Sequence, residues 1–236
     1  MRGTVICDLD GTLVDSASDL ADALDVLLAE HGLDPVGIEG TRKLIGHGIA
    51  NLVRRGFEVR GHGLVKADRD AAIARFRDLY AERLPARTVV YPGVQGALDR
   101  LQAEGWRLVV CTNKLEAFSR TILDSLGLLG YFALVAGPDT FDVAKPDPQH
   151  LLRTLPVDRR PDYTAIMVGD SEVDIEVAKS AGLPVIAVTY GYSQTPLATL
   201  APHALVDSFS EVPDHVARIA ALQNAKRHPV KMKAAS

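Results

Sequence analysis

The feature of this sequence that most constrains its fold is an alternation of short apolar runs with longer amphipathic stretches. The runs have the length of strands, and several are apolar at every position, which is typical of parallel strands covered on both faces. They are TVIC (4–7), RLVVC (107–111), YFALVA (131–136), TAIMV (164–168) and PVIAVT (184–189). The stretches between them have helical periodicity, and two of them end at glycines suited to closing a helix, Gly127 and Gly182. This pattern predicts an α/β fold built on a doubly wound, Rossmann-like parallel sheet.

One long segment lacks strand-like runs. From about residue 15 to residue 87 only helical periodicity is found, for example in the leucines Leu20, Leu24, Leu27 and Leu28. A gap of this length is unusual inside a single sheet. We therefore expect a helical cap domain, residues 15–87, inserted into an α/β core domain made of residues 1–14 and 88–236. The alternative is that these helices pack directly on the sheet.

Composition and charge exclude several classes of protein. With 236 residues, 47% of them hydrophobic, the chain can bury a sizeable core. Its formal net charge of −4 offers no general attraction to nucleic acid or to anionic membranes. No apolar run reaches transmembrane length, and because the first strand is expected almost at the first residue, we expect no signal peptide.

Two cysteines, Cys7 and Cys111, are too few for a disulfide scaffold and fit a reducing compartment. We expect both to be small buried hydrophobic residues behind the strand ends. The chain is thus expected to be soluble and cytoplasmic, without nucleic-acid or membrane partners, and its oligomeric state stays open. The basic segment KRHPVKMKAAS, from Lys226 onward, is expected to be a disordered, solvated tail.

Polar side chains gather at the points where the predicted strands end. In open α/β sheets, ligands bind outside the carboxyl ends of the strands, so these side chains should converge at one edge. They are Asp8 and Asp10, Thr112 and Asn113, Lys145, and Asp170 with Ser171.

Each of these features has an ordinary structural explanation when taken singly. Asp10–Gly11 is a turn signal, Lys145–Pro146 fits a solvated loop, and Asp170–Ser171 fits a helix N-cap. A calcium loop starting at Asp8 is excluded, because its sixth position requires glycine and is Leu13 here. It is their coincidence at strand ends that favours a reactive site.

The balance of charge indicates what such a site could bind. Carboxylates this close together repel each other unless a cation lies between them, and Mg²⁺ is the usual oxygen-bound cation beside phosphate. A metal ion and Lys145 could together hold a phosphate group. One carboxylate could then act as a nucleophile, and a second as a general acid and base.

Four segments resemble the motifs of the haloacid dehalogenase superfamily. They are DLDGTLVDS, CTN, KPDP and GDSEVDIEVAKSAG, in that order between residues 8 and 182. The helical insert lies where the first cap class of that family has its cap. The second aspartate, Asp10, resembles the phosphatase branch of the family, because the dehalogenases lack it. CTNK (111–114), GPDTFDVAKPDP (137–148) and LIGHGIANLVRR (44–55) further look like the phosphoglycolate phosphatase branch. Leu115 departs from that branch, in which proline often follows TNK.

The resemblance implies a Mg²⁺-dependent phosphomonoester hydrolase that acts through an aspartyl phosphate. It implies that Asp8 is the nucleophile and that Asp10 is first the general acid and then the general base. By the same resemblance, Thr112 and Lys145 would bind the transferring phosphoryl oxygens, and Asn113 would position the substrate.

The resemblance also implies a set of metal ligands. Mg²⁺ would be held by the carboxylate of Asp8, the main-chain carbonyl of Asp10 and the carboxylate of Asp170. Asp174, one helical turn after Asp170, and Ser171 would support these ligands from behind.

The expected substrate is a small phosphorylated metabolite, and the resemblance favours 2-phosphoglycolate. Its carboxylate would meet the cap turn Gly46–His47–Gly48, whose main-chain N–H groups could bind an anion, with Arg42, Lys43 or Arg54 adding charge. The ordinary explanation of this turn is a simple helix–helix connection.

Three functions are alternatives to a phosphoglycolate phosphatase. The chain could be a phosphatase of another small metabolite or sugar phosphate, or a sugar phosphomutase on the same fold. A non-catalytic phosphate-binding regulator should lack at least one of Asp8, Asp10, Lys145 and Asp170, and all four are present.

Overall fold

The structure, a computed structural model, describes residues 2–157 and 163–227 of the chain. Its centre is a six-stranded sheet in the order β5-β4-β1-β6-β7-β8, in which every pair of neighbours is parallel. The strands are β1 (Gly3–Cys7), β4 (Trp106–Cys111), β5 (Leu134–Ala136), β6 (Thr164–Gly169), β7 (Val185–Val188) and β8 (Ala204–Val206). The predicted doubly wound parallel sheet is confirmed.

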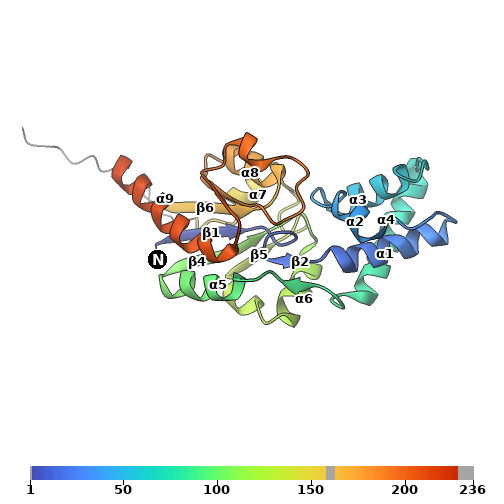
Figure 1. Cartoon of the computed structure of the whole chain (residues 1–236), viewed down its shortest axis with the longest axis horizontal. Coiled ribbons are helices and arrows are strands. Elements are labelled where there is room, and N and C mark those ends of the chain that lie inside the picture. Colours follow the sequence, from blue (N-terminus) through green and yellow to red (C-terminus); the bar gives the residue numbers. More distant parts are fainter. Residues whose placement is uncertain (1, 158–162, 228–236) are drawn as a thin grey trace, which may run out of the picture.

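Helices cover both faces of this sheet (Figure 1). α5 (Val94–Ala103), α6 (Glu116–Ser125) and α9 (Val212–Arg227) share a hydrophobic core with one face. α7 (Pro148–Leu152) and α8 (Glu172–Ser180) pack on the other. Because successive side chains of a strand point to opposite faces, a sheet covered on both sides needs apolar residues at every position. This is the pattern seen in the sequence.

The two cysteines follow this alternation. β1 and β4 are neighbours with Cys7 opposite Val110, so Cys111 lies one residue further along. Cys7 therefore packs on the α5 face and Cys111 on the α7 face. Both are buried and unpaired, and burial raises the pKa of each thiol well above its ordinary value. Both behave as small hydrophobic residues, as expected.

Several elements differ from the sequence prediction. The run YFALVA becomes a strand only at Leu134, because Leu129–Tyr131 form a 3-10 turn, η1. Two further short 3-10 turns, η2 (Leu197–Leu200) and η3 (Phe209–Glu211), precede and follow β8. Neither β8 nor α9 was predicted. α9 extends to Arg227, and the rest of the basic segment, with Lys231 and Lys233, lies outside the described residues.

Four helices between the first and third strands form a bundle at one end of the sheet (Figure 1), and we call them the cap. They are α1 (Ala17–Glu30), α2 (Gly37–Arg42), α3 (Gly48–Glu58) and α4 (Lys66–Arg83). The cap has a hydrophobic core of its own, to which the leucines of α1, Phe57 of α3, and Phe76 and Tyr80 of α4 contribute. The cap helices thus bury their apolar faces mainly against one another.

The chain enters and leaves the cap through a small antiparallel ribbon. It consists of β2 (Val14–Asp15) and β3 (Val89–Val90), with Val14 opposite Val90. Asp19, buried in the first turn of α1, accepts hydrogen bonds from the main-chain N–H groups of Arg87, at 2.8 Å, and Thr88, at 3.0 Å. One buried carboxylate therefore ties the incoming and outgoing segments together.

Candidate active site

The loop that follows β1 is folded by local constraints around a glycine. Leu13 N–H and Val14 N–H both donate to the carbonyl of Leu9, at 2.9 and 3.1 Å, which turns the chain sharply after Asp8. Gly11 has a φ of +88°, and a Cβ there would lie 2.3 Å from a carboxylate oxygen of Asp170. Only glycine fits this position, because it alone permits both the conformation and the close approach. The loop thereby brings Asp8 and Asp10 to the carboxyl edge of the sheet.

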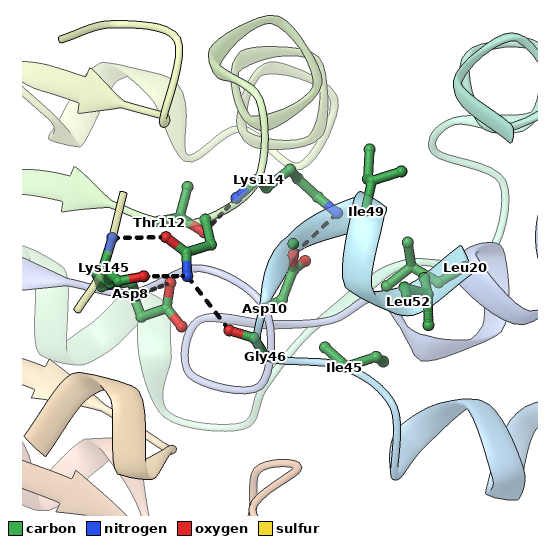
Figure 2. A pocket seen from close by; sticks show the side chains of 12 residues that line it. Asp8, Asp10, Leu20, Ile45, Gly46, Ile49, Leu52, Thr112, Lys114 and Lys145 are labelled. Atoms are coloured by element: carbon green, nitrogen blue, oxygen red, sulfur yellow. Dashed lines mark hydrogen bonds and ion pairs between the residues drawn. The ribbon is translucent and has the colours of Figure 1, made fainter. Parts of the chain in front are cut away.

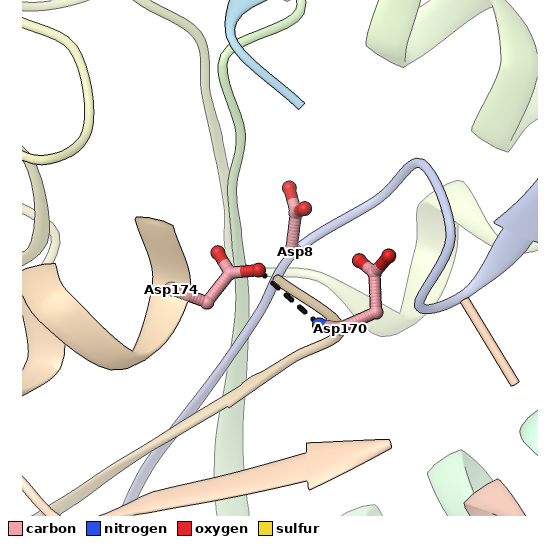
Figure 3. A group of neighbouring side chains, drawn as sticks. All are labelled: Asp8, Asp170 and Asp174. Carbon is pink, nitrogen blue, oxygen red and sulfur yellow. Dashed lines mark hydrogen bonds between the residues drawn. The ribbon is translucent and has the colours of Figure 1, made fainter. Parts of the chain in front are cut away.

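Three buried carboxylates meet at this edge (Figure 3). One oxygen atom from each of Asp8, Asp170 and Asp174 lies within 4.8 Å of the others. Asp174 is held by α8, whose first turn is a capping box in which Ser171 Oγ donates to Asp174 Oδ2 at 2.6 Å. The same Oδ2 accepts from the main-chain N–H of Asp170 at 3.2 Å. Asp174 is thus fixed by its hydrogen bonds and supports the other two from behind.

Asp170 is oriented by the loops that follow β1 and β7. Its Oδ1 accepts from Thr12 Oγ1 at 3.0 Å, and its Oδ2 accepts from the main-chain N–H of Tyr192 at 2.7 Å. A carboxylate oxygen has two lone pairs, so each oxygen can still accept another contact. Neither Thr12 nor Tyr192 was singled out from the sequence.

Lys145 is the cation inside this cluster. Its Nζ lies 2.8 Å from Asp8 Oδ1 and 2.7 Å from Asp174 Oδ1. The side-chain amide of Asn113 fixes the lysine's main chain: Oδ1 accepts from Lys145 N–H at 2.9 Å and Nδ2 donates to Lys145 C=O at 3.1 Å. The amide of Asn113 thus positions Lys145, and because Asn113 also lines the cavity described below, its expected contact with the substrate stays a prediction.

The cluster has an excess of negative charge that a metal ion would balance. Burial, opposed by Lys145 and reinforced by Asp174, raises the pKa of Asp8 to about 6. Burial, together with Asp174 and Asp8, also raises the pKa of Asp170 well above its ordinary value. Oxygen-only ligands around an uncompensated charge suit a hard divalent cation. Asp174 already accepts from Lys145, Ser171 and the main-chain N–H of Asp170, whereas Asp8 and Asp170 have fewer partners and fit a metal ion better.

Asp10 lies apart from this cluster and has partners of its own. Its Oδ1 accepts from Ser16 Oγ at 2.5 Å, and its Oδ2 lies 3.0 Å from Lys114 Nζ. Lys114 is buried and also donates to the hydroxyl of Tyr80, in α4 of the cap, at 2.8 Å. Burial lowers the pKa of Lys114, but the Asp10 carboxylate and Tyr80 more than offset it and hold that pKa above its ordinary value. Asp10 therefore faces a permanent cation.

A cavity of about 40 Å³ joins these groups (Figure 2). Its core side consists of the polar residues Asp8, Asp10, Thr112, Asn113, Lys114 and Lys145. Its cap side consists of Leu20, Ile45, Gly46, Gly48, Ile49 and Leu52. The carboxylates and ammonium groups are therefore roofed by mainly apolar side chains, which exclude water and strengthen electrostatic interactions.

The cap meets the core through the turn at residues 46–48. Asn113 Nδ2 donates to Gly46 C=O at 3.5 Å, and a Cβ on Gly48 would lie 3.3 Å from the carbonyl of Asn113. Gly48 has a φ of +78°, so a residue with a side chain would be strained there in any case. The glycines let the cap turn approach the loop after β4 closely.

Residues 5–188 match the model of the haloacid dehalogenase-like hydrolases. The chain belongs to this family. It is 40% identical over 208 residues to a phosphoglycolate phosphatase of Mesorhizobium japonicum, an alignment that covers 88% of this chain and 92% of the relative. It is 42% identical over 221 residues to a phosphoglycolate phosphatase of Rhodospirillum rubrum, covering 91% and 90%.

Solved structures agree with these relatives. A crystal structure of a predicted phosphoglycolate phosphatase from Haemophilus somnus superposes with a TM-score of 0.81 at 28% identity, over 91% of this chain and 98% of that one. CbbY from Rhodobacter sphaeroides, solved in complex with phosphate, gives 0.70 at 25% identity, over 90% and 96%. The haloacid dehalogenase-like chain is therefore a phosphoric monoester hydrolase, as its motifs indicated.

Two arginines that the sequence analysis placed beside the substrate lie elsewhere in this hydrolase. Arg42 contacts Asp15 Oδ2 at 2.5 Å and stacks over the ring of Tyr192, so it belongs to the ribbon at the base of the cap. Arg54 pairs with Glu58 at 2.6 Å on the exposed side of α3. Both guanidinium groups are engaged away from the cavity, and this part of the prediction is corrected.

Other cap residues lie nearer to the carboxylates. Lys43, His47 and Arg55 line an outer hollow of about 100 Å³ whose wall also includes Asp8, Asp10 and Asp170. The sequence pattern suggested Arg54 as the cation of α3 that faces the core, whereas in the structure it is the next residue, Arg55. Consecutive helix residues are rotated by about 100° about the helix axis, so Gly48, Leu52 and Arg55 share one face of α3 and Arg54 points to another.

Within residues 2–157 and 163–227, no helix combines the length and apolarity needed to cross a membrane.

Proposed function

We propose that this hydrolase removes phosphate from 2-phosphoglycolate, with Mg²⁺ and through an aspartyl phosphate on Asp8. The observation that carries the proposal is the small roofed cavity lined by Asp8, Lys145 and Asp10, in which Asp8 belongs to the buried acidic cluster. Relatives that share about 40% of its sequence are named for this substrate. The two buried, unpaired cysteines suit a reducing compartment such as the cytoplasm.

In the first step, a carboxylate oxygen of Asp8 attacks phosphorus and the ester P–O bond breaks. Lys145 and the Thr112 hydroxyl bind the phosphoryl oxygens and hold them in line. Asp10 donates its proton to the leaving glycolate oxygen, so the leaving group departs as an alcohol. Mg²⁺ held by Asp8, the main-chain carbonyl of Asp10 and Asp170 would supply further charge stabilisation to the phosphoryl oxygens.

In the second step, water attacks the phosphorus of phosphorylated Asp8. Asp10, now deprotonated, accepts the water proton, and the bond from phosphorus to the Asp8 oxygen breaks to release phosphate. Lys114 Nζ and Ser16 Oγ hold the Asp10 carboxylate in place for this second role. The apolar cap residues Leu20, Ile49 and Leu52 limit the entry of other water molecules.

The test is phosphate release by the purified protein with Mg²⁺ from 2-phosphoglycolate, ethyl phosphate and a hexose phosphate. We expect the highest kcat/KM for 2-phosphoglycolate. Faster release from the hexose phosphate would overturn the substrate, and formation of an isomeric sugar phosphate would favour the mutase alternative. Acid quenching of an Asp10→Asn reaction with p-nitrophenyl phosphate, whose leaving group needs little protonation, should trap a phosphoryl group on Asp8, and its absence would argue against the covalent step.

A further inference from the structure

The cavity contains two buried ammonium groups, and phosphoryl transfer uses only one of them. Lys145 lies beside Asp8, where the phosphate is expected. The Nζ of Lys114 lies beside Asp10, toward the cap residue Ile49 (Figure 2). A buried charge is costly to maintain unless it is paired. The question is therefore what Lys114 does in addition to its contact with Asp10.

The two lysines are anchored in the same way. An ammonium group has three N–H donors. Lys145 contacts two oxygens, one from Asp8 and one from Asp174, and Lys114 likewise contacts Asp10 Oδ2 and Tyr80 Oη. Among the described residues, Lys114 Nζ has no further polar partner. Each lysine thus keeps one donor, and both line the cavity.

The surroundings of Lys114 suit an anion and leave it little competition. Leu20, Ile49 and Leu52 form the adjoining wall, so a charge-assisted hydrogen bond there is shielded from water. Of the cationic side chains first assigned to substrate, Arg42 and Arg54 are engaged elsewhere. Lys43 and Arg55 line the outer hollow, which shares Asp8 and Asp10 with this cavity, but they do not line the cavity itself.

The chemistry of the substrate places its second anion next to Asp10. Asp10 must reach the leaving oxygen, and in 2-phosphoglycolate one methylene group separates that oxygen from the carboxylate. A cation in contact with Asp10 is therefore within reach of the carboxylate while phosphate is held at Asp8. We propose that Lys114 binds the carboxylate of the substrate and selects 2-phosphoglycolate over phosphate esters that lack one. This inference rests on the proposed function.

The proposed carboxylate site at Lys114 depends on the cap, because Lys114 is held by Tyr80 of α4. The tyrosine belongs to α4, its ring packs edge-on against Phe118 of α6 at 5.3 Å between centroids, and its hydroxyl holds Lys114. The carboxylate site is complete only where α4 lies against the core. Tyr80 is a positioning residue in this scheme, because it acts through Lys114.

The experiment compares 2-phosphoglycolate with ethyl phosphate, which has the same carbon count without the carboxylate. In Lys114→Met, we expect the ratio of kcat/KM for the two esters to fall about tenfold to a hundredfold, the loss typical of one charge-assisted contact. Any effect of losing the partner of Asp10 acts on both esters and cancels in the ratio. Lys66→Met, which removes an exposed cap lysine, should leave the ratio unchanged.

The outcomes separate the two proposals. If the wild type prefers 2-phosphoglycolate and Lys114→Met keeps that preference, Lys114 does not bind the carboxylate and only this inference is overturned. If the wild type shows no preference, the substrate assignment fails and Lys114 fails with it. Residual turnover of ethyl phosphate reports that a variant is folded. Lys114→Gln, which can still contact Tyr80 but carries no charge, serves if the methionine variant does not fold.

Discussion

Four aspartates lie in one small region, and their neighbours give each a different chemistry. Asp8 faces Lys145, and Asp170 is fixed by two hydrogen bonds from distant loops. Both oxygens of Asp174 already accept contacts from neighbouring groups. Asp10 is separated from them by its contacts with Lys114 and Ser16. The proposed nucleophile, metal ligand, support and acid–base group are thus the same residue type, and they differ in their local charge and hydrogen bonding.

Replacing Asp8 tests the nucleophile at the residue scale. Asp8→Asn keeps the volume but removes the attacking carboxylate, so we expect kcat to fall by at least about a thousandfold. In the absence of metal ion the same variant should have a higher Tm at pH 7, because burial makes ionised Asp8 unfavourable above its pKa of about 6. Phosphate release and thermal unfolding check the two effects. Substantial turnover in the purified variant would contradict covalent catalysis by this residue.

At the scale of elements, the ribbon β2–β3 and the loop after β7 are joined by hydrogen bonds. Tyr192 joins them: its main-chain N–H binds Asp170, and its hydroxyl accepts from Ser16 N–H at 2.9 Å and donates to Asp15 at 2.8 Å. Arg42 of the cap lies over the same ring. The residue that orients a proposed metal ligand therefore also holds the entry to the cap.

Removing the Tyr192 hydroxyl tests this connection. Tyr192→Phe keeps the ring and the main-chain contact to Asp170 but leaves the N–H of Ser16 and the carboxylate of Asp15 without this partner. We expect the free energy of unfolding to fall by about 1–3 kcal/mol and KM to rise, because cap closure becomes less well defined. The matched control is Tyr163→Phe, which loses a hydroxyl bonded to Thr4 in the sheet. Tyr163→Phe should lower stability without changing KM. Equal changes in KM in the two variants would contradict a role of the Tyr192 hydroxyl in cap closure.

For the whole molecule, the acidic cluster couples metal binding to stability. Two carboxylates with raised pKa values destabilise the metal-free fold near neutral pH, and an ion bound only by the folded state reverses this. We expect Mg²⁺ at about a hundredfold excess over its Kd to raise Tm by roughly 5–10 °C, and a chelator to stop turnover. Asp170→Asn should abolish the shift in Tm, whereas the exposed Glu39→Gln should retain it. An undiminished shift in Asp170→Asn would exclude that residue as a ligand.

The response of the molecule to acid should depend on His150. This buried side chain contacts the carbonyl of Gly137 at 3.2 Å, and burial, with Lys145 nearby, lowers its pKa to about 4. Between about pH 6.5 and pH 4, His150 takes up a proton in the unfolded chain but not in the folded chain, so its contribution to stability is lost as pH falls. This contribution should be roughly 3 kcal/mol, and it is measured as the difference between the wild type and His150→Gln, because Asp8 and Asp170, whose raised pKa values act in the opposite direction, are common to both. Urea unfolding across this range checks it, and the exposed His62→Gln should follow the wild type.

The sequence by itself determined the elements whose signals are local. Apolar runs at every position predicted β1, β4, β6 and β7, because a strand buried on both faces cannot alternate. Parallel strands place their carboxyl ends at one edge, so the convergence of Asp8, Thr112, Lys145 and Asp170 followed from the order of the strands. β8 escaped notice because it is only three residues long and Leu205 is partly exposed.

Only the tertiary structure decided contacts between segments that are distant in the chain. Lys114 was visible in the motif CTNK, but its pairing with Tyr80 depends on how α4 docks against the core. Which arginine of α3 faces the core depends on the rotation of that helix, and this favours Arg55 over Arg54. Periodicity records which face of an element is buried, whereas the partner across the interface is set by the packing of the whole molecule.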